Sequence, residues 1–462
     1  MLSALLVFAF MFGYAFFSLI WPCRINVIFK SVWTIAFALC SIKCLIYTDT
    51  GNLSYPNLRP SQVLFIETLF NTIFLAVIMA MIKDVLLLIL WCLIKVKLLN
   101  AFTFKQSLIN ISISLSALVL SVLGTFSQVQ PPKVNYQEVY FDTLTNDFDG
   151  YKIAQISDLH MGPVLRRYYL NEIVAQINSN KPDLIVLTGD TIDAPFDIRR
   201  DDFDPMAMLN SKDGVLAVTG EHDYYNDYAQ WHQFFSQMGI RYLCNESVII
   251  KRGIGSIKIT GIPDSYGATV SLDEAPNLLF ANFNIIDYDY KKEHVSFGQT
   301  QSNRFMNKGL FDYDVMMLNF KKVQRAITEA WSMTIYENNR RNTMKFAHES
   351  SFADIQILLA HNPNITKNHD LNAELVLSGH THGGVMFFLK PIVAYFNNGL
   401  VSGLYSLDNL RQIFISNGAG IWSAFSCRIF VPAQIDIIVL KRNLGRWFLA
   451  FFYKTPRIGH SE

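Results

Sequence analysis

The chain has 462 residues, and its 39 lysines and arginines nearly balance its 38 aspartates and glutamates. This length exceeds what one small core needs and indicates more than one module. The neutral balance argues against a general nucleic-acid binder, which needs a basic face to neutralise phosphates. The hydrophobic fraction of 51% is high for a soluble protein, and the excess lies in the first ~130 residues, where charge nearly disappears. The composition therefore favours a membrane region followed by a polar domain.

Four apolar stretches precede the polar region, each near or beyond the ~20 residues that a spanning helix needs. They run over Leu2–Ile20, Ile25–Tyr47, Val63–Ile94 and Leu108–Phe126. The first has no positively charged leading segment and no small-residue cleavage site, so we expect a retained helix rather than a signal peptide. Lys83 and Asp84 interrupt the third, and we expect these two charges to pair near one membrane face.

Positive charge is uneven among the connections between these stretches. Five lysines and arginines flank the first and third connections, whereas only Lys43 and Arg59 flank the second and Lys133 follows the fourth stretch. The positive-inside rule then places the first and third connections in the cytoplasm. We therefore predict a multi-pass integral membrane protein whose N-terminus and polar domain are extracytoplasmic.

The six cysteines form neither a disulfide framework nor a zinc-binding pair. Only Cys244 and Cys427 lie in the polar part, and the other four lie in or beside the apolar stretches. The chain has no Cys-x-x-Cys pair, so structural zinc is not indicated. A bridge between Cys244 and Cys427 remains open.

After the extended linker at residues 128–132, short apolar runs alternate with helical segments. The runs that read as strands are Tyr151–Ile156, Leu184–Leu187, Val215–Val218, Ile355–Leu359, Leu375–Leu377, Ser406–Phe414 and Gln434–Leu440. Tyr168–Asn178 reads as a helix between the first two. This alternation predicts an α/β sheet. Between Asp273 and Ser350 the pattern fades, and we expect an insertion there that contains a helix over Val315–Ala330.

Five of these strand-like runs end in residues that bind metals. In chain order they are Asp158 with His160, then Asp190, then Glu221, His222 and Asp223, then His361, and last His380 with His382. A lone Asp-x-His or Gly-Asp is more often a solvated turn. Five such clusters at strand ends indicate a functional site, because the carboxyl ends of strands collect functional groups at one sheet edge. Carboxylates and neutral imidazoles are the ligands that paired divalent cations need.

In this order the clusters resemble the calcineurin-like metallophosphoesterase superfamily, where Asp-x-His, Gly-Asp, Gly-Asn-His-Asp/Glu, a lone His and Gly-His-x-His follow one another. In this chain the motifs and their neighbours are Ser157-Asp158-Leu159-His160, Thr188-Gly189-Asp190 and Gly379-His380-Thr381-His382-Gly383-Gly384. The pattern resembles most the membrane-anchored branch, in which N-terminal helices precede the phosphoesterase domain. The resemblance implies transmembrane helices followed by a four-layer α/β/β/α sandwich with the site at one sheet edge.

The resemblance also implies a role for each residue. Asp158, His160 and His382 would hold a first metal, and His361 and His380 a second. Asp190 would bridge both. His222 would donate a proton to the leaving group, oriented by Asp223. The implied chemistry is hydrolysis of a phosphomonoester, phosphodiester or pyrophosphate bond by hydroxide that two divalent metal ions (Mn, Fe or Zn) make available.

One position departs from the family pattern. Glu221 stands where the family has the asparagine that gives its side-chain oxygen to the second metal. A carboxylate can still bind Mn²⁺, Fe or Zn²⁺, but it adds a negative charge. We expect Glu221 to bind the second metal with an altered metal preference or lower turnover.

The predicted organisation is a transmembrane region of about four helices (1–127), a linker and first strand (128–150), a metallophosphoesterase domain (151–445) with an insertion at 273–350, and a tail (446–462) that contains the aromatic run Trp447–Tyr453. We predict a membrane-anchored, metal-dependent phosphoesterase. Its partners would be the membrane and a phosphorylated substrate. The anchor favours a phospholipid or lipid-linked diphosphate over soluble nucleotides or phosphoproteins, and no nucleic acid is expected.

A non-catalytic receptor or scaffold with a degenerate phosphoesterase domain is the alternative. Glu221 and the large insertion motivate this alternative, whereas retention of the other ligand positions and of His222 argues against it. A channel formed by the helices has little support, because few polar residues face any consistent stripe.

Overall fold

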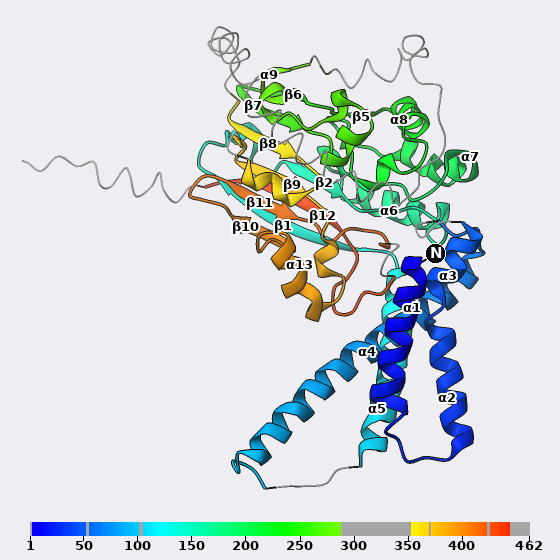
Figure 1. Ribbon diagram of the computed structural model, residues 1–462. Coiled ribbons are helices and arrows are strands. Elements are labelled where there is room, and N and C mark those ends of the chain that lie inside the picture. Colours follow the sequence, from blue (N-terminus) through cyan, green and yellow to red (C-terminus); the bar gives the residue numbers. More distant parts are fainter. Residues whose placement is uncertain are drawn as a thin grey trace, which may run out of the picture.

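The computed structural model describes residues 2–51, 55–100, 105–286, 288, 353–368, 371–422 and 426–443. A helical N-terminal part lies on one side of two β-sheets (Figure 1). Most of the insertion expected over 273–350 lies outside the described residues. The helix expected over Val315–Ala330, the run Trp447–Tyr453 and the tail over 446–462 also lie outside them.

All four apolar stretches form helices. They are α1 (Leu2–Ala15), which continues as the π-helical turn η1 (Phe16–Ile20), α2 (Val27–Cys40), α3 (Lys43–Thr50), α4 (Pro60–Lys95) and α5 (Gln106–Gln128). Among the described residues, α4 and α5 are each long and apolar enough to cross a membrane. The pair α2 and α3, bent by 40°, makes a third span if it is counted as one. The apolar part of the first helix, Leu6–Ile20, is shorter than a span, so the structure supports two or three crossings by length and composition, where four were predicted.

In the charged pair of the third stretch, Lys83 is buried in this helix bundle and Asp84 lies at its edge. Lys83 Nζ is 3.2 Å from Asp84 Oδ1, and the hydroxyls of Tyr14 and Ser18 donate to Asp84 Oδ2. Lys83 also donates to the Ser18 carbonyl of η1 at 2.6 Å. Charge within a membrane segment is costly unless it is paired. Lys83 and Asp84 pair as predicted, and their hydrogen bonds with Tyr14 and Ser18 tie α4 to α1 and η1.

The first sheet has the strand order β1-β12-β2-β3-β4-β5. Its strands are β1 (Lys133–Phe141), β2 (Lys152–Ile156), β3 (Leu184–Thr188), β4 (Val215–Val218), β5 (Ile240–Tyr242) and β12 (Gln434–Arg442). Strands β2 to β5 are parallel, and β12 pairs antiparallel with β2 and parallel with β1. Parallel neighbours need crossover connections. Here α6 (Arg167–Ser179) lies between β2 and β3 in the chain, and α8 (Tyr228–Gln237) lies between β4 and β5.

The second sheet has the strand order β10-β11-β9-β8-β7-β6. Its strands are β6 (Glu246–Arg252), β7 (Gly255–Gly261), β8 (Ile355–Leu359), β9 (Leu375–Ser378), β10 (Gly403–Ser406) and β11 (Gln412–Ile415). The run expected as one strand over Ser406–Phe414 is instead a hairpin of β10 and β11. Asp408 causes the turn, because its carboxylate accepts hydrogen bonds from the backbone N–H groups of Leu410 and Arg411.

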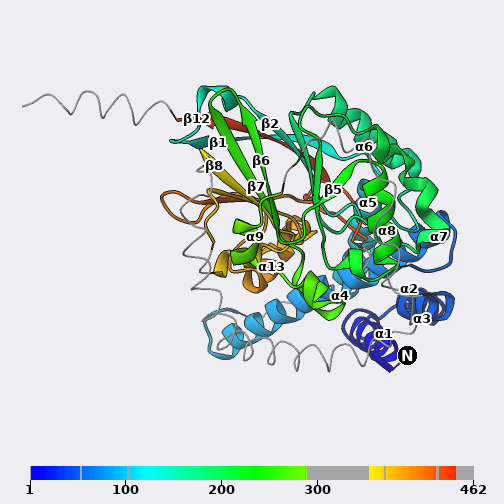
Figure 2. The same ribbon diagram turned by 90° about the horizontal axis from the view of Figure 1, so that it is seen from above.

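The two sheets pack face to face, and helices cover their outer faces (Figure 2). Within β3, Leu184 and Val186 belong to the cluster between the sheets, whereas Ile185 and Leu187 belong to the cluster beneath α6. Helix α9 (Leu278–Phe283) covers the second sheet. Because the strands are buried on both faces, they read as continuous apolar runs. Burial of each such side chain contributes about 1.5–3 kcal/mol. The predicted α/β/β/α sandwich is therefore confirmed.

Helices α4 and α5 pack directly against residues 426–429 of the sheet domain. Asn71 Nδ2 donates to the Ser426 carbonyl at 2.9 Å, and the Arg428 N–H donates to the Gly124 carbonyl at 3.1 Å. A Cβ at Gly124 would collide with the Cys427 sulfur, so this approach requires glycine. Cys427 and Cys244 are both free thiols, so the structure has no disulfide bridge between them.

Candidate metal centre

The five polar clusters meet at one end of the sandwich, where strands of both sheets end. Three of them follow β2, β3 and β4 of the first sheet, and two follow β8 and β9 of the second. The structure brings together all seven side chains predicted to bind metal: Asp158, His160, Asp190, Glu221, His361, His380 and His382. Strand carboxyl ends thus gather the site, as the alternating pattern indicated.

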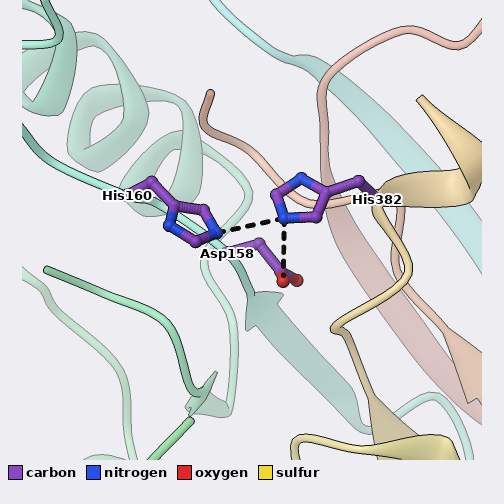
Figure 3. Close-up of side chains that lie close together, drawn as sticks. All are labelled: Asp158, His160 and His382. Atoms are coloured by element: carbon purple, nitrogen blue, oxygen red, sulfur yellow. Dashed lines mark hydrogen bonds and ion pairs between the residues drawn. The ribbon is translucent and has the colours of Figure 1, made fainter. Parts of the chain in front are cut away.

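Asp158, His160 and His382 form a first group that could hold a metal ion (Figure 3). His160 Nε2 is 3.0 Å from His382 Nε2, which is 3.4 Å from Asp158 Oδ1. All three side chains are almost fully buried. A cation between the two imidazole nitrogens, facing their lone pairs, would account for this close approach.

Glu221, His361 and His380 form a second such group. Glu221 Oε2 is 3.1 Å from His380 Nδ1 and 4.0 Å from His361 Nε2. Asp190 lies between the two groups, because its Oδ2 is 3.6 Å from His160 Nε2 and 3.2 Å from His361 Nε2. One carboxylate within reach of both groups is what a bridging ligand requires.

The hydrogen bonds of the histidines fit metal binding. His361 Nδ1 lies 2.8 Å from the Thr188 carbonyl, to which it can only donate, so the lone pair of the neutral ring is on Nε2. His361 Nε2 and His380 Nδ1 are buried and face the carboxylates of Asp190 and Glu221 at 3.2 and 3.1 Å, but neither makes a well-aligned hydrogen bond with a described residue. A buried nitrogen that is not satisfied in this way is costly unless a ligand binds it. These imidazoles and carboxylates, with no thiolate among them, fit Mn, Fe or Zn.

Burial makes the charges in this centre interdependent. Burial opposes ionisation of Asp190, but the imidazoles of His361 and His222 hold its pKa well below its usual range. Burial also opposes protonation of His361, yet Asp190 and the neighbouring carboxylates raise its pKa well above its usual range. A proton on His361 therefore balances the charge of Asp190 in the absence of a cation. Metal binding at His361 should release that proton.

Five of the predicted ligands have left-handed backbone conformations. Their φ values are 51° for Asp158, 42° for His160, 53° for Asp190, 70° for His380 and 49° for His382. Such conformations cost on the order of 1–3 kcal/mol each in residues other than glycine and persist where the surroundings enforce them. The sharp turns at the strand ends direct these side chains toward one point.

Asp193, which the sequence analysis did not identify, contacts two histidines of the centre. Its Oδ2 is 3.1 Å from His160 Nδ1, and its Oδ1 is 2.6 Å from His222 Nδ1. Burial disfavours the charged form of His222, but Asp193 and Asp190 outweigh burial and raise its pKa to about 10. The available signal was the spacing Gly189-Asp190-x-x-Asp193, which adds a second carboxylate to the same loop.

Asp223 has a different place from the one predicted. Its carboxylate accepts hydrogen bonds from the backbone N–H groups of Asp190, Thr191 and Gly220, at 3.0, 2.8 and 2.8 Å. It therefore joins the loops after β3 and β4. Asp193 contacts the His222 ring, whereas Asp223 accepts from backbone N–H groups, so the geometry fits an orienting role for Asp193 better than the one predicted for Asp223.

The centre is open on the side of the second group. The side chains of Glu221 and His380 are 26% and 24% exposed, whereas His160 is fully buried. The first group is covered by Trp422, whose ring stacks on His382 with centroids 6.0 Å apart. A substrate would therefore meet Glu221 and His380 first.

Comparison with known proteins agrees with this geometry. Residues 151–384 match the family described as calcineurin-like phosphoesterase. A "transmembrane protein with metallophosphoesterase domain" of Danio rerio is 26% identical, over 74% of this chain and 64% of the relative. A Bos taurus protein of the same name is 26% identical, over 70% of this chain and 60% of the relative. An uncharacterized metallophosphoesterase of Campylobacter jejuni is 26% identical, over 75% of each chain.

The chain spans less than two thirds of the length of the two vertebrate relatives. The family match nevertheless contains every predicted site residue, from Asp158 to His382, and ends at Gly384, just after the last histidine. The chain belongs to the calcineurin-like phosphoesterases.

Proposed function

We propose that this protein is a membrane-anchored phosphoesterase that uses two divalent metal ions. The observation that carries the proposal is the position of Asp190, within 3.6 Å of His160 and 3.2 Å of His361, so that one carboxylate serves both ligand groups. When bound, the two cations would polarise a phosphoryl oxygen and make hydroxide available near neutral pH.

The ligand groups suggest the assignment of each residue. Asp158, His160 and His382 would hold one cation, and Glu221, His361 and His380 the other, with Asp190 shared. The ring of His222 is fixed through Nδ1, so its Nε2 is the atom that can give a proton to the leaving oxygen.

The first test is hydrolysis of a chromogenic phosphodiester, bis(p-nitrophenyl) phosphate, by the full chain in detergent micelles. We expect activity to disappear after chelation and to return with Mn²⁺, Fe²⁺ or Zn²⁺. His361→Asn should remove the return of activity. His232→Asn, in a histidine on α8 outside the centre, should keep it. A folded, metal-loaded sample without hydrolysis would favour the alternative of a receptor or scaffold with a degenerate site.

Glu221→Asn tests the residue that departs from the family pattern. Asp158, Asp190 and Glu221 offset three of the four positive charges that two divalent cations bring, whereas asparagine would leave two uncompensated. We expect the second group to bind metal at least about tenfold more weakly. Loss of a residue that only hydrogen-bonds to a metal ligand already lowers metal affinity by about 10–100-fold. We also expect phosphate to inhibit more strongly, because the site stays more positive.

Metal content after dialysis and inhibition by inorganic phosphate measure these two effects. Glu246→Gln is the matched control, because Glu246 of β6 is partly buried in an ion pair with Arg241 of β5, outside the metal centre. If Glu221→Asn changes neither metal content nor phosphate inhibition, Glu221 does not bind the metal.

A further inference from the structure

The segment after the Gly-His-Thr-His-Gly-Gly turn presents large apolar side chains on the surface. It forms η9 (Phe387–Leu389) and α13 (Lys390–Phe396). Phe430 from a neighbouring loop joins it, with its ring 5.6 Å from that of Phe387. These exposed side chains together form the α13 face, and their exposed fractions are 52% for Phe387, 56% for Ile392, 83% for Tyr395, 70% for Phe396 and 82% for Phe430. Contiguous apolar exposure of this kind marks an interaction site in a soluble region.

The backbone holds this face in place. Phe430 has a φ of 57°, a left-handed conformation that is rare for a bulky side chain. The adjacent Ile429 accepts a hydrogen bond from the Phe387 N–H at 3.1 Å and donates to the Val385 carbonyl at 3.3 Å. The surroundings thus enforce an outward ring at a conformational cost, which is typical of built functional surfaces.

The inner side of the same segment packs on the membrane helices. Val385, Met386 and Ile429 share one hydrophobic cluster with Ile73 of α4 and Ala117 of α5. Both views show α13 on the side of the sheets that faces α4 (Figures 1 and 2). Among the described residues, α4 and α5 are each long and apolar enough to span a bilayer, and residues 427–429 meet α5 at Gly124, close to its C-terminal end. The α13 face is continuous with this contact.

The charge around the face also suits a lipid surface. Residues 384–401 and 417–433 contain one lysine, one arginine and no acidic residue. Arg428 is buried and donates to the carbonyls of Asn417, Gly418 and Gly420. Lys390, which is partly exposed, is the other basic residue of these two segments, and a Cβ at Gly384 would lie 2.9 Å from its Cγ. Aromatic and aliphatic side chains beside a lysine favour the interface of an anionic membrane.

We propose that the α13 face lies in the headgroup layer of the bilayer that α4 and α5 span. The metal centre would then act on phosphate groups that lipids carry in that layer, an assignment that rests on the proposed function. The connection is short, because η9 follows the His382 turn directly and Lys390 packs on Gly384 of that turn. An immersed α13 thus brings the turn with His380 and His382 close to the headgroups.

Photocrosslinking tests the position of the face without any measurement of activity. Tyr395 is replaced by p-benzoylphenylalanine in the full chain, which is reconstituted in vesicles of phosphatidylcholine and phosphatidylglycerol. The matched control is Tyr140, an exposed tyrosine on β1. We expect phospholipid adducts, detected by mass spectrometry, at Tyr395 and not at Tyr140. Equal lipid adducts at both sites, no lipid adduct at Tyr395, or an adduct to a second copy of the chain would each overturn the proposal.

Competition tests the lipid substrate. Phosphatidic acid in vesicles and glycerol 3-phosphate in solution carry the same phosphomonoester, and each is added during hydrolysis of the chromogenic phosphodiester. We expect the vesicle-borne form to inhibit at an about tenfold lower bulk concentration, because the anchored enzyme meets it at the surface. Ile392→Asp combined with Phe396→Asp should abolish this preference and keep hydrolysis of the soluble diester.

Ile254→Asp is the control for added charge, because Ile254 is 94% exposed on the β6–β7 turn, away from α13. It should keep the preference for the vesicle-borne phosphate. Equal inhibition by the two phosphomonoesters would refute the lipid assignment. A lack of hydrolysis before any competitor is added would instead contradict the proposed function, and the photocrosslinking result would still stand.

Discussion

Asp190→Asn is expected to lower phosphodiester turnover by about 10³-fold, the loss of several kcal/mol of charge stabilisation at the metals. Asp190 Oδ1 accepts the His222 N–H at 2.8 Å, while Oδ2 faces both His160 and His361. An amide of the same size has only one oxygen and no charge, so it cannot serve both directions. We therefore expect the variant to retain at most one of the two metal ions.

Metal analysis and thermal unfolding measure this loss independently of turnover. Added Mn²⁺ should raise the unfolding temperature of the wild-type protein and raise that of the variant much less, since ligands stabilise only the state that binds them. Retention of two metal ions, or turnover within tenfold of wild type, would show that Asp190 does not bridge.

Asp183→Asn is the matched control at the opposite end of the same strand. Asp183 is a buried carboxylate that accepts from the Lys152 N–H at 2.8 Å and from Lys212 Nζ at 2.7 Å. Burial opposes its ionisation, but Lys212 and its other donors lower its pKa. Its loss should reduce the unfolding temperature and leave the metal response unchanged. A similar loss of metal in both variants would mean that general destabilisation explains the effect.

Strands that read as continuous apolar runs were predicted, whereas β6 and β7 were not. Leu184–Leu187 and Val215–Val218 were recognisable because both faces of these strands are buried. Strands β6 and β7 were not predicted, since Lys251 and Lys258 interrupt their apolar pattern. The pairing of β7 with β8 joins residues about a hundred positions apart, across the insertion. No local pattern reports such a pairing.

The metal-binding residues of the candidate site could be predicted from the sequence, but the hydrogen bonds between residues of different strands could not. Each predicted ligand directly follows an apolar run, and that position is visible in a sequence. Asp193 lies further along its loop, and its role depends on meeting His160 and His222, which come from other strands. The carboxylate of Asp223 was free to serve either the ring of His222 or the backbone of Asp190 until the fold placed it. Hydrogen-bond partners of this kind are decided by tertiary structure.

His222→Asn should reveal a proton donor through its dependence on the leaving group. General acid catalysis contributes about 10²–10⁴-fold, and only where the leaving oxygen needs a proton. We therefore expect a loss of that size for an alkyl phosphate ester and a small loss for a p-nitrophenyl ester, whose leaving group departs as a stable anion. The ratio of turnover for the two esters is the measurement.

Asp193→Asn should change the same reaction through pH. Asp193 lies 2.6 Å from His222 and, with Asp190, raises its pKa to about 10, so the proton stays on the ring at neutral pH. Without that carboxylate the pKa of His222 falls. When the pH is raised, turnover of the alkyl ester should therefore begin to fall at a lower pH in the variant than in the wild-type protein. The alkaline side of the pH profile for the p-nitrophenyl ester should change little.

Loss of His160 alignment is the competing explanation, because Asp193 also contacts that ligand at 3.1 Å. Weaker metal binding would reduce turnover of both esters alike and would be overcome by added metal. A proton-donor defect would persist at saturating metal and remain confined to the alkyl ester. Equal losses for the two esters in His222→Asn would mean that His222 contributes to binding of the phosphate rather than to proton transfer.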